Sequence, residues 1–254
     1  MSAVAVLLIA IGIADACGRS TRFVWLPVAV GPVVVAVCAA LGALWHVGDI
    51  VLLAFAAAAT AAWQLLCARS ERTGAHHLAP LVVFGASLGL LMVLSGLGCE
   101  VGGTVARWSR WVALPFNDFP PTRLLMIVGV VLAQFATGNR LVRVVLASVG
   151  AVRPVGEPQP SDRLKGGRLL GPMERLLILS LGVGGQVAAA SAVVAAKGII
   201  RVPELNAQKS STDNATGVGI DEVTEYFLVG SFASWLLALG SIALVLAAGT
   251  TAVR

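Results

Sequence analysis

Long apolar runs separated by short polar stretches dominate this chain. The hydrocarbon core of a bilayer takes about 20 mainly apolar residues in a helix, and seven runs approach or exceed that length. The apolar positions are continuous rather than alternating, which favours helices over the strands of a membrane barrel. The pattern predicts seven transmembrane helices, at residues 2–17, 24–45, 50–68, 78–98, 122–138, 172–199 and 224–248.

The composition indicates a membrane protein. Of the 254 residues, 57% are hydrophobic and only 12% are charged, and the mean hydropathy is +0.89. A soluble domain carries about 25% charged residues, so this chain has too little polar surface to cover a globule in water. We therefore predict an all-α, polytopic transmembrane helical bundle. We expect it in the cell membrane, with the bacterial inner membrane as the expected location and the lipid bilayer as its main partner.

The positive charge is interpreted as an orientation signal. The net charge is +5 and the basic residues lie between the apolar runs, as they do in the cytoplasmic loops of membrane proteins. Of 18 basic residues, twelve fall on one side of the predicted bundle. The other six are Arg107, Arg110, Arg123, Lys197, Arg201 and Lys209. This excess predicts the N-terminus outside and the C-terminus in the cytoplasm, and we expect no nucleic acid partner.

The connections divide the chain into three predicted parts. Residues 1–138 hold the first five spans, and residues 171–254 hold the last two. Between them, residues 139–170 form the longest cytoplasmic connection. Its first part is amphipathic, with Leu141 and Val144 at helical spacing, and is expected to lie among lipid head groups. The proline-rich remainder either tethers the two halves or binds a soluble partner.

Polar side chains concentrate in the sixth predicted span. At 100° per residue, four of them fall within a wedge of about 80°. A polar stripe on a transmembrane helix normally faces the bundle interior or a cavity, because lipid does not satisfy it. Together with the polar start of the seventh span, this stripe predicts a binding site. Its candidate residues are Glu174, Arg175, Gln186, Lys197, Arg201, Glu204, Glu225 and Tyr226.

The basic members of this set predict a transport or binding protein for an anionic solute or lipid. Two other functions stay open. One is a lipid-modifying membrane enzyme with Glu174 or Glu225 as general acid or base. The other is a non-catalytic scaffold subunit. The same charges also suit a structural ion pair that joins the outer ends of the last two spans, because basic side chains near helix ends reach the interface readily. No cofactor is predicted.

Motifs for nucleotide and metal chemistry are missing from the sequence. It contains neither a G-x-x-x-x-G-K-[ST] phosphate loop nor an H-E-x-x-H zinc motif, which disfavours a nucleotide-driven motor and a metalloprotease. The four cysteines include no C-x-x-C pair, so no metal site is predicted from them. His46 lies three residues before Asp49. Such a pair can relay protons or bind metal, but we assign it to the short loop before the third span.

A set of rare polar residues recurs through residues 163–240. It comprises the run Gly167–Leu176 (GRLLGPMERL), then Gly185-Gln186, Ala196-Lys197, Arg201, Glu204, the run Glu225–Ser231 (EYFLVGS) and Ser234. In this pattern the chain resembles an uncharacterised family of bacterial multi-pass membrane proteins, a domain-of-unknown-function family. The resemblance implies a membrane location and a helical fold but supplies no activity and no catalytic residue. In the N-terminal half, only His46 and Asp49 match the His-Asp feature of that family.

Overall fold

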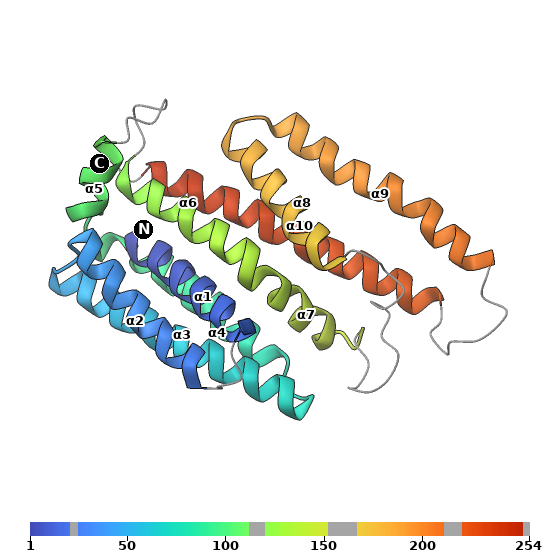
Figure 1. Cartoon of the computed structure of the whole chain (residues 1–254), viewed down its shortest axis with the longest axis horizontal. Helices are drawn as coiled ribbons and strands as arrows, with labels where there is room; N and C mark the ends of the chain where they lie inside the picture. The colour runs from blue at the N-terminus through green and yellow to red at the C-terminus, as the bar shows by residue number, and fades with distance from the viewer. Residues whose placement is uncertain (21–24, 112–119, 152–166, 211–219, 251–254) are drawn as a thin grey trace. The chain divides into compact units, whose positions relative to one another are not determined.

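The computed structural model is helical throughout the residues that it describes. These are residues 1–20, 25–111, 120–151, 167–210 and 220–250, with side chains described except at 20, 167–169, 200–210, 220–223 and 250. No strand occurs among them. The elements in Figure 1 are α1 (Ser2–Ser20), α2 (Trp25–Gly42), α3 (Val47–Thr73), α4 (Leu78–Val93), η1 (Leu94–Leu97), α5 (Gly103–Trp111), α6 (Pro121–Leu132), η2 (Ala133–Thr137), α7 (Gly138–Ser148), α8 (Gly167–Val183), α9 (Val187–Ser210) and α10 (Ile220–Thr250).

Six helices of the described chain are long and apolar enough to cross a membrane. They are Ser2–Arg19, Trp25–Gly42, Val47–Thr73, Leu78–Leu97, Pro121–Ser148 and Thr224–Gly249. Each coincides with a predicted span, mostly to within a few residues. The predicted all-α fold of a multi-pass membrane protein is thereby confirmed. The side of the membrane that each end faces stays a prediction, as do the cell membrane and the bacterial origin.

The prediction of one continuous sixth span is wrong. α8 ends at Val183 and α9 begins at Val187. Between them Gly185 has a φ of 76°, and the Gln186 N–H donates to the Leu181 carbonyl at 2.8 Å. A glycine with positive φ and this backward hydrogen bond commonly end a helix. The chain therefore reverses, and α8 packs against α9 as a hairpin. The polar stripe along one straight helix does not exist.

The fifth predicted span continues beyond residue 138. α6, the π-helical turn η2 and α7 follow one another without interruption to Ser148. The amphipathic stretch that was expected to begin the cytoplasmic connection is therefore the end of this helix, and Leu141 and Val144 are buried. Residues 152–166 of the predicted linker lie outside the described residues. Binding of a soluble partner by residues 139–170 stays a prediction.

The helices form two compact units. The first unit comprises residues 1–75, 79–137 and 243–254, and the second comprises residues 76–78 and 138–242. In the first unit, α1 packs against α2, α3 and α6.

Because α1 is covered on several sides, its residues Val4 to Leu7 are fully buried. The close approach of α1 and α6 depends on Gly129, where a Cβ would lie 2.8 Å from the Ala5 carbonyl oxygen. Small residues permit such close approach between membrane helices.

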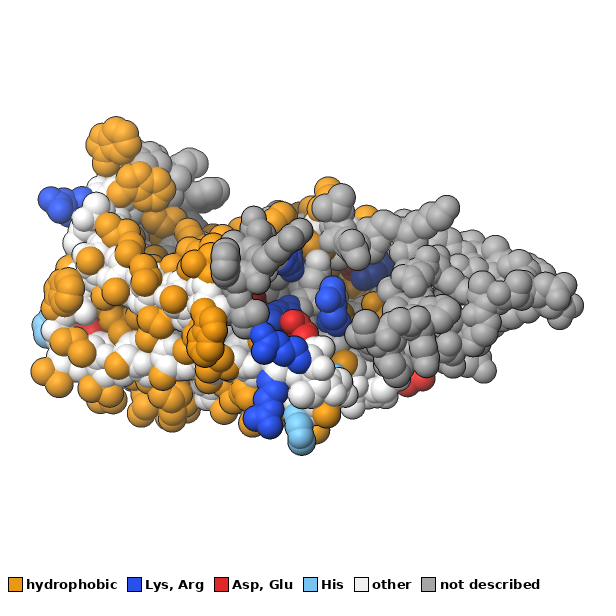
Figure 2. Space-filling model, turned by 60° about the horizontal axis from the view of Figure 1, so that its bottom comes forward, with side chains coloured by type: hydrophobic (Ala, Val, Ile, Leu, Met, Phe, Trp, Pro, Cys, Tyr) orange, Lys and Arg blue, Asp and Glu red, His pale blue; other side chains and the backbone are white. Residues whose placement is uncertain are grey.

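Many large hydrophobic side chains point outward. Val82 and Val93 on α4 are 64% and 81% exposed, and Trp25 at the start of α2 is 76% exposed. Figure 2 shows hydrophobic side chains spread over much of the described surface on one face. Exposed apolar surface of this extent is unusual for a soluble monomer and indicates contact with membrane or protein. Given the six spanning helices, these residues are expected to face the lipid bilayer.

The predicted interfacial connector between the fourth and fifth spans contains the short helix α5. Trp108 and Trp111 on α5 are 50% and 82% exposed, as expected for tryptophans at a membrane–water boundary. Phe116 and Phe119, which were assigned to the same boundary, lie outside the described residues. The connector ends where α6 begins at Pro121, a position that tolerates proline because its missing N–H has no helical partner there.

Candidate functional site

The α8–α9 hairpin brings a carboxylate and an ammonium group together. Glu174 on α8 and Lys197 on α9 lie about equally far from the turn at Gly185, so the reversal places them side by side. The Lys197 Nζ is 2.6 Å from the Glu174 Oε2, and the two side chains are 17% and 8% exposed. In one straight helix, about 35 Å would separate these residues. Sequence reasoning nominated both residues but placed them at opposite ends of a span.

Trp235 of α10 contacts both members of this ion pair. Its indole Nε1 donates to the Glu174 Oε1 at 3.0 Å. The Lys197 Nζ lies 5.9 Å from the centre of the Trp235 ring, within the range of a cation–π interaction. The carboxylate of Glu174 therefore accepts one hydrogen bond on each oxygen, from an ammonium and from an indole.

Arg175, next to Glu174, is also deeply buried, at 2% exposure. Its Nη1 donates to the Ser234 hydroxyl at 3.3 Å, and its Nη2 donates to the Asn139 Oδ1 at 2.7 Å. The guanidinium lies close against Gly138, where a Cβ would be 2.9 Å from Nη2. Glycine at the start of α7 therefore makes room for the guanidinium. We call Asn139, Glu174, Arg175, Lys197, Ser234 and Trp235 the polar centre.

The remaining predicted site residues lie elsewhere. Gln186 is exposed at the hairpin turn, so it is not a mid-membrane polar group. Glu225 is exposed and Tyr226 is half-buried on α10, about 12 to 15 Å along the helix from Ser234 and Trp235. The side chains of Arg201 and Glu204 lie outside the described residues. Lys197, which was expected to meet the acidic start of the last helix, pairs with Glu174 instead.

Two members of the polar centre escaped sequence reasoning. Asn139 follows the end of the predicted fifth span and was assigned to a connection, although the helix continues through it. Trp235 lies within the last apolar run, where its bulk hid its polar N–H. A buried tryptophan usually finds a partner for that N–H, and this requirement was the available signal.

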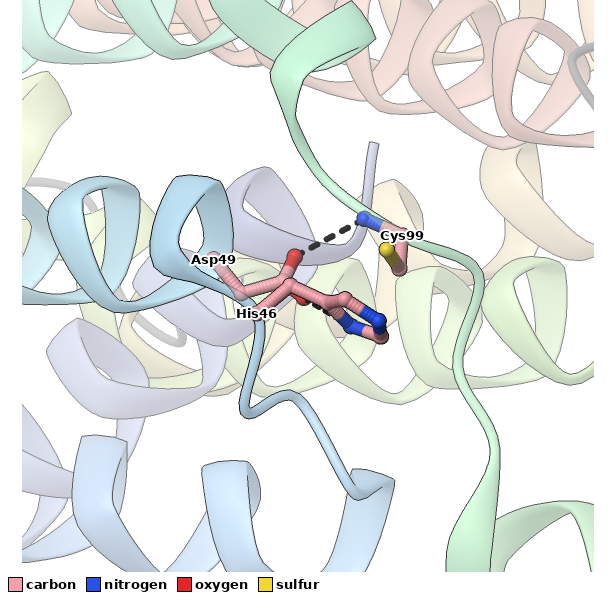
Figure 3. Close-up of side chains that lie close together, drawn as sticks. All are labelled: His46, Asp49 and Cys99. Carbon is pink, nitrogen blue, oxygen red and sulfur yellow. Dashed lines mark hydrogen bonds and ion pairs between the residues drawn. The ribbon is translucent and has the colours of Figure 1, made fainter.

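A second cluster lies in the first unit, where His46, Asp49 and Cys99 meet (Figure 3). One potential ligand atom from each residue lies within 4.8 Å of the other two. His46 immediately precedes α3, Asp49 is in the first turn of α3, and Cys99 follows η1. The His46 Nδ1 is 3.6 Å from the Asp49 Oδ2. We call these three residues the His–Asp–Cys cluster.

The environment of the cluster is strongly graded. The His46 side chain is 73% exposed, whereas the Asp49 side chain is only 2% exposed. The Asp49 Oδ1 accepts a hydrogen bond from the Cys99 N–H at 2.8 Å, and the Cys99 carbonyl accepts one from the Ser2 hydroxyl at 3.0 Å. Loss of hydration, followed by the negative charge of Asp49, raises the pKa of the Cys99 thiol.

One sequence match to an enzyme motif proves to be structural. Gly85-Ala86-Ser87-Leu88-Gly89 has the G-x-S-x-G spacing of a nucleophile elbow. That motif needs a sharp turn between a strand and a helix, which presents the serine to substrate. Here all five residues lie inside α4, and Ser87 is buried at 6% exposure. The segment therefore gives no support for a serine hydrolase.

Comparison of the chain with protein-family models, with characterised proteins and with solved structures finds no match. The family resemblance of residues 163–240 thus stays a prediction. The chemistry of the polar centre and of the His–Asp–Cys cluster is the remaining guide to function.

Proposed function

We propose that this chain is a membrane transport or binding protein that takes the anionic group of a lipid or solute at the polar centre. The observation that carries the proposal is the grouping of two cationic side chains around a single carboxylate. Arg175 and Lys197 supply the positive charges and Glu174 the negative one. Together these three residues carry a net positive charge, which favours an anionic ligand.

A purely structural role explains the polar centre less well. Replacing a buried ion pair by well-packed apolar residues is often neutral or stabilising, so packing alone does not require one. Charged groups in membrane proteins are costly, and they commonly mark substrate or ion pathways. Arg175 and Glu174 lie on a helix whose neighbouring positions Leu176 and Ile178 are apolar, so the local sequence retains charge where apolar residues would fit.

The geometry supports binding by exchange of partners. In the structure Glu174 occupies the Lys197 ammonium as an internal counter-ion, at 2.6 Å. An incoming phosphate or carboxylate would take the place of Glu174 beside Lys197. Arg175 presents a planar fork of donors that suits both groups, and the Ser234 hydroxyl lies within reach of the same fork. Release of the anion would restore the Glu174–Lys197 pair.

Glu174→Gln separates this proposal from a structural clamp. The glutamine still offers an oxygen to the Trp235 N–H but no longer neutralises Lys197. A binding site should then hold anions about tenfold more tightly, because the internal competitor is gone. Lys197→Gln should weaken anion binding by about 10- to 100-fold, as expected for loss of one charge-assisted hydrogen bond. Arg72→Gln, an exposed residue on α3 of the first unit, is the matched control.

The measurement is native mass spectrometry of the full chain in nanodiscs. One arm contains phosphatidylglycerol in phosphatidylcholine, and the other contains phosphatidylcholine alone with added inorganic phosphate. Retention in the first arm only identifies a lipid head group, and retention in both identifies a site for free anions. Equal retention by wild type, Glu174→Gln and Lys197→Gln would refute the proposed site. Chemical alteration of the retained lipid would point to the lipid-modifying enzyme instead.

A further inference from the structure

We propose that the His–Asp–Cys cluster is a binding site for a zinc-type divalent metal ion, separate from the polar centre and from the anion binding proposed for it. The three side chains offer an imidazole nitrogen, a carboxylate oxygen and a sulfur. Zinc binds all three kinds of ligand. Thiolate and imidazole ligands select zinc or another late transition metal over Mg²⁺ and Ca²⁺, which prefer oxygen.

The distances suit such an ion after a small adjustment. In a tetrahedral zinc site the ligand atoms are about 3.5 Å apart, given metal–ligand bonds of about 2.0 to 2.3 Å. The His46 Nδ1 and the Asp49 Oδ2 already lie 3.6 Å apart. All three ligand atoms lie within 4.8 Å of one another, so the widest edge has to close by only about 1 Å. The His46 side chain is 73% exposed, which leaves it free to make this movement.

The Asp49 carboxylate provides independent support. Its Oδ2 is buried and has no hydrogen-bond partner, although the side chain is only 2% exposed. A buried carboxylate oxygen without a hydrogen bond is costly, and the distance to His46 is too long for one. The other oxygen, Oδ1, is held by the Cys99 N–H at 2.8 Å. This bond fixes the carboxylate so that Oδ2 faces the imidazole and the thiol. A metal ion would satisfy Oδ2.

The backbone is shaped for this approach. Gly48 lies one residue before Asp49, and a Cβ there would overlap the Leu97 carbonyl oxygen. Gly98 lies one residue before Cys99, and a Cβ there would be 3.1 Å from the Asp49 Oδ1. Glycines at these two positions let the start of α3 and the segment after η1 come close enough for Asp49 and Cys99 to meet.

Three protein ligands leave one tetrahedral position open. Structural zinc sites usually have four protein ligands, whereas sites that bind water or substrate keep a fourth position free. The exposed His46 places that position on the solvent side of the cluster. The structure therefore favours an exchangeable ion accessible from outside the helix bundle over a permanently enclosed one.

The test measures metal bound to the purified full chain after removal of any affinity tag. The protein is loaded with Zn²⁺ and desalted, and zinc per chain is measured by mass spectrometry of the elements. A parallel titration with Co²⁺ monitors the thiolate-to-cobalt absorption band. We expect about one ion per chain, following the count of one cysteine and one histidine in the cluster. We also expect a thiolate band that is lost in Cys99→Ala.

Matched variants make the result specific. His46→Asn and Asp49→Asn should each weaken Zn²⁺ binding by about 100-fold or more, since even partners outside the ligand set change metal affinity by about 10- to 100-fold. The amide of Asp49→Asn can still accept the Cys99 N–H, so the local fold is retained. Cys38→Ala and His76→Asn are the controls. His76 has a φ of 60°, which asparagine tolerates.

Either of two outcomes would overturn the proposal. One is a wild-type protein that retains far less than one zinc ion per chain. The other is a cobalt spectrum and a zinc affinity that persist in Cys99→Ala and Asp49→Asn. Failure of this test would leave the anion-binding proposal untouched, because the two clusters share no residue.

Discussion

The Glu174 carboxylate depends on groups from two other helices. Lys197 and Trp235 each contact one of its oxygens, and Glu174 is the residue through which α8, α9 and α10 share polar contacts. A charged group with few described contacts to water needs such donors, because a buried polar atom left without a partner costs about 1 to 3 kcal/mol. The contribution of each donor can be measured separately.

Trp235→Phe removes only the indole N–H while keeping most of the ring. The Glu174 Oε1 then loses its 3.0 Å hydrogen bond, and the free energy of unfolding is expected to fall by about 1 to 3 kcal/mol. Thermal unfolding in detergent measures the change. Trp108→Phe on α5 is the control, because Trp108 is half-exposed. An unchanged midpoint in Trp235→Phe would show that the indole bond contributes nothing.

The thiol of Cys99 should react more slowly than an ordinary cysteine at neutral pH. Thiolate is the reactive form, and desolvation together with Asp49 raises the pKa of Cys99. The rate of alkylation in chelator-treated protein should therefore rise with pH and reach its midpoint above the usual range. Asp49→Asn removes the negative charge, so the midpoint should move to lower pH, while desolvation keeps part of the elevation. A midpoint that moves upward or stays fixed in Asp49→Asn would contradict this account.

Sequence reasoning could name single residues of the sites but not their contacts. Glu174, Arg175 and Lys197 were identified because ionisable residues are rare in apolar runs. Their grouping depends on the hairpin, which the spacing of charges does not reveal. Cys99 was missed for a simpler reason: it lies 50 residues after Asp49, and no local spacing links a cysteine to a histidine and a carboxylate that far away.

At the scale of elements, the length of apolar runs predicted most of the helices. Six predicted spans match helices of the structure because hydrophobicity and length are sufficient to define a membrane helix. The same criterion failed at the α8–α9 turn. Leu181, Val183, Val187 and the glycines between them keep the run apolar, so hydrophobicity passes through the turn without a break. Only the adjacent pair Gly184-Gly185 marked it.

Gly48 should be essential for the junction between α3 and η1. Gly48→Ala places a methyl group against the Leu97 carbonyl oxygen, and neither backbone segment can move without separating Asp49 from Cys99. We expect a loss of about 1 to 3 kcal/mol, as for overpacking elsewhere, measured by thermal unfolding. Gly85→Ala on α4, where a Cβ would meet open space, should instead stabilise the helix by up to about 1 kcal/mol. Equal effects of the two substitutions would exclude the close contact.

At the scale of the whole molecule, contacts in the first unit link the start of α1 with the end of α10. The Ser2 hydroxyl donates to the Cys99 carbonyl, and two residues later the Val101 N–H donates to the Thr122 hydroxyl. Gly249 lies beside Arg123, the next residue along α6. Ser2 and Gly249 therefore lie at the same end of the first unit, as an even number of crossings would place them.

This arrangement makes a prediction about sidedness. Single cysteines at Glu100 and Gly249 should react with a membrane-impermeant reagent from the same side of the membrane. A cysteine at Thr73, at the other end of α3, should react from the opposite side. The charge distribution in the sequence predicts an outside N-terminus and a cytoplasmic C-terminus, which would put positions 100 and 249 on opposite sides. Labelling of intact cells against lysed cells decides between these two orientations.

The hairpin also bears on how the chain enters the membrane during synthesis. From Leu176 to Ala196 no ionisable side chain occurs. A straight helix through this region would have to carry either Glu174 and Arg175 or Lys197 through the hydrocarbon, at about 2.5 to 3.5 kcal/mol for each arginine or lysine on scales from cellular insertion. A hairpin needs only its neutral turn to enter the bilayer, while the charged residues at its open end stay together. The Glu174–Lys197 pair can therefore form before the last helix, with Trp235, arrives from the ribosome.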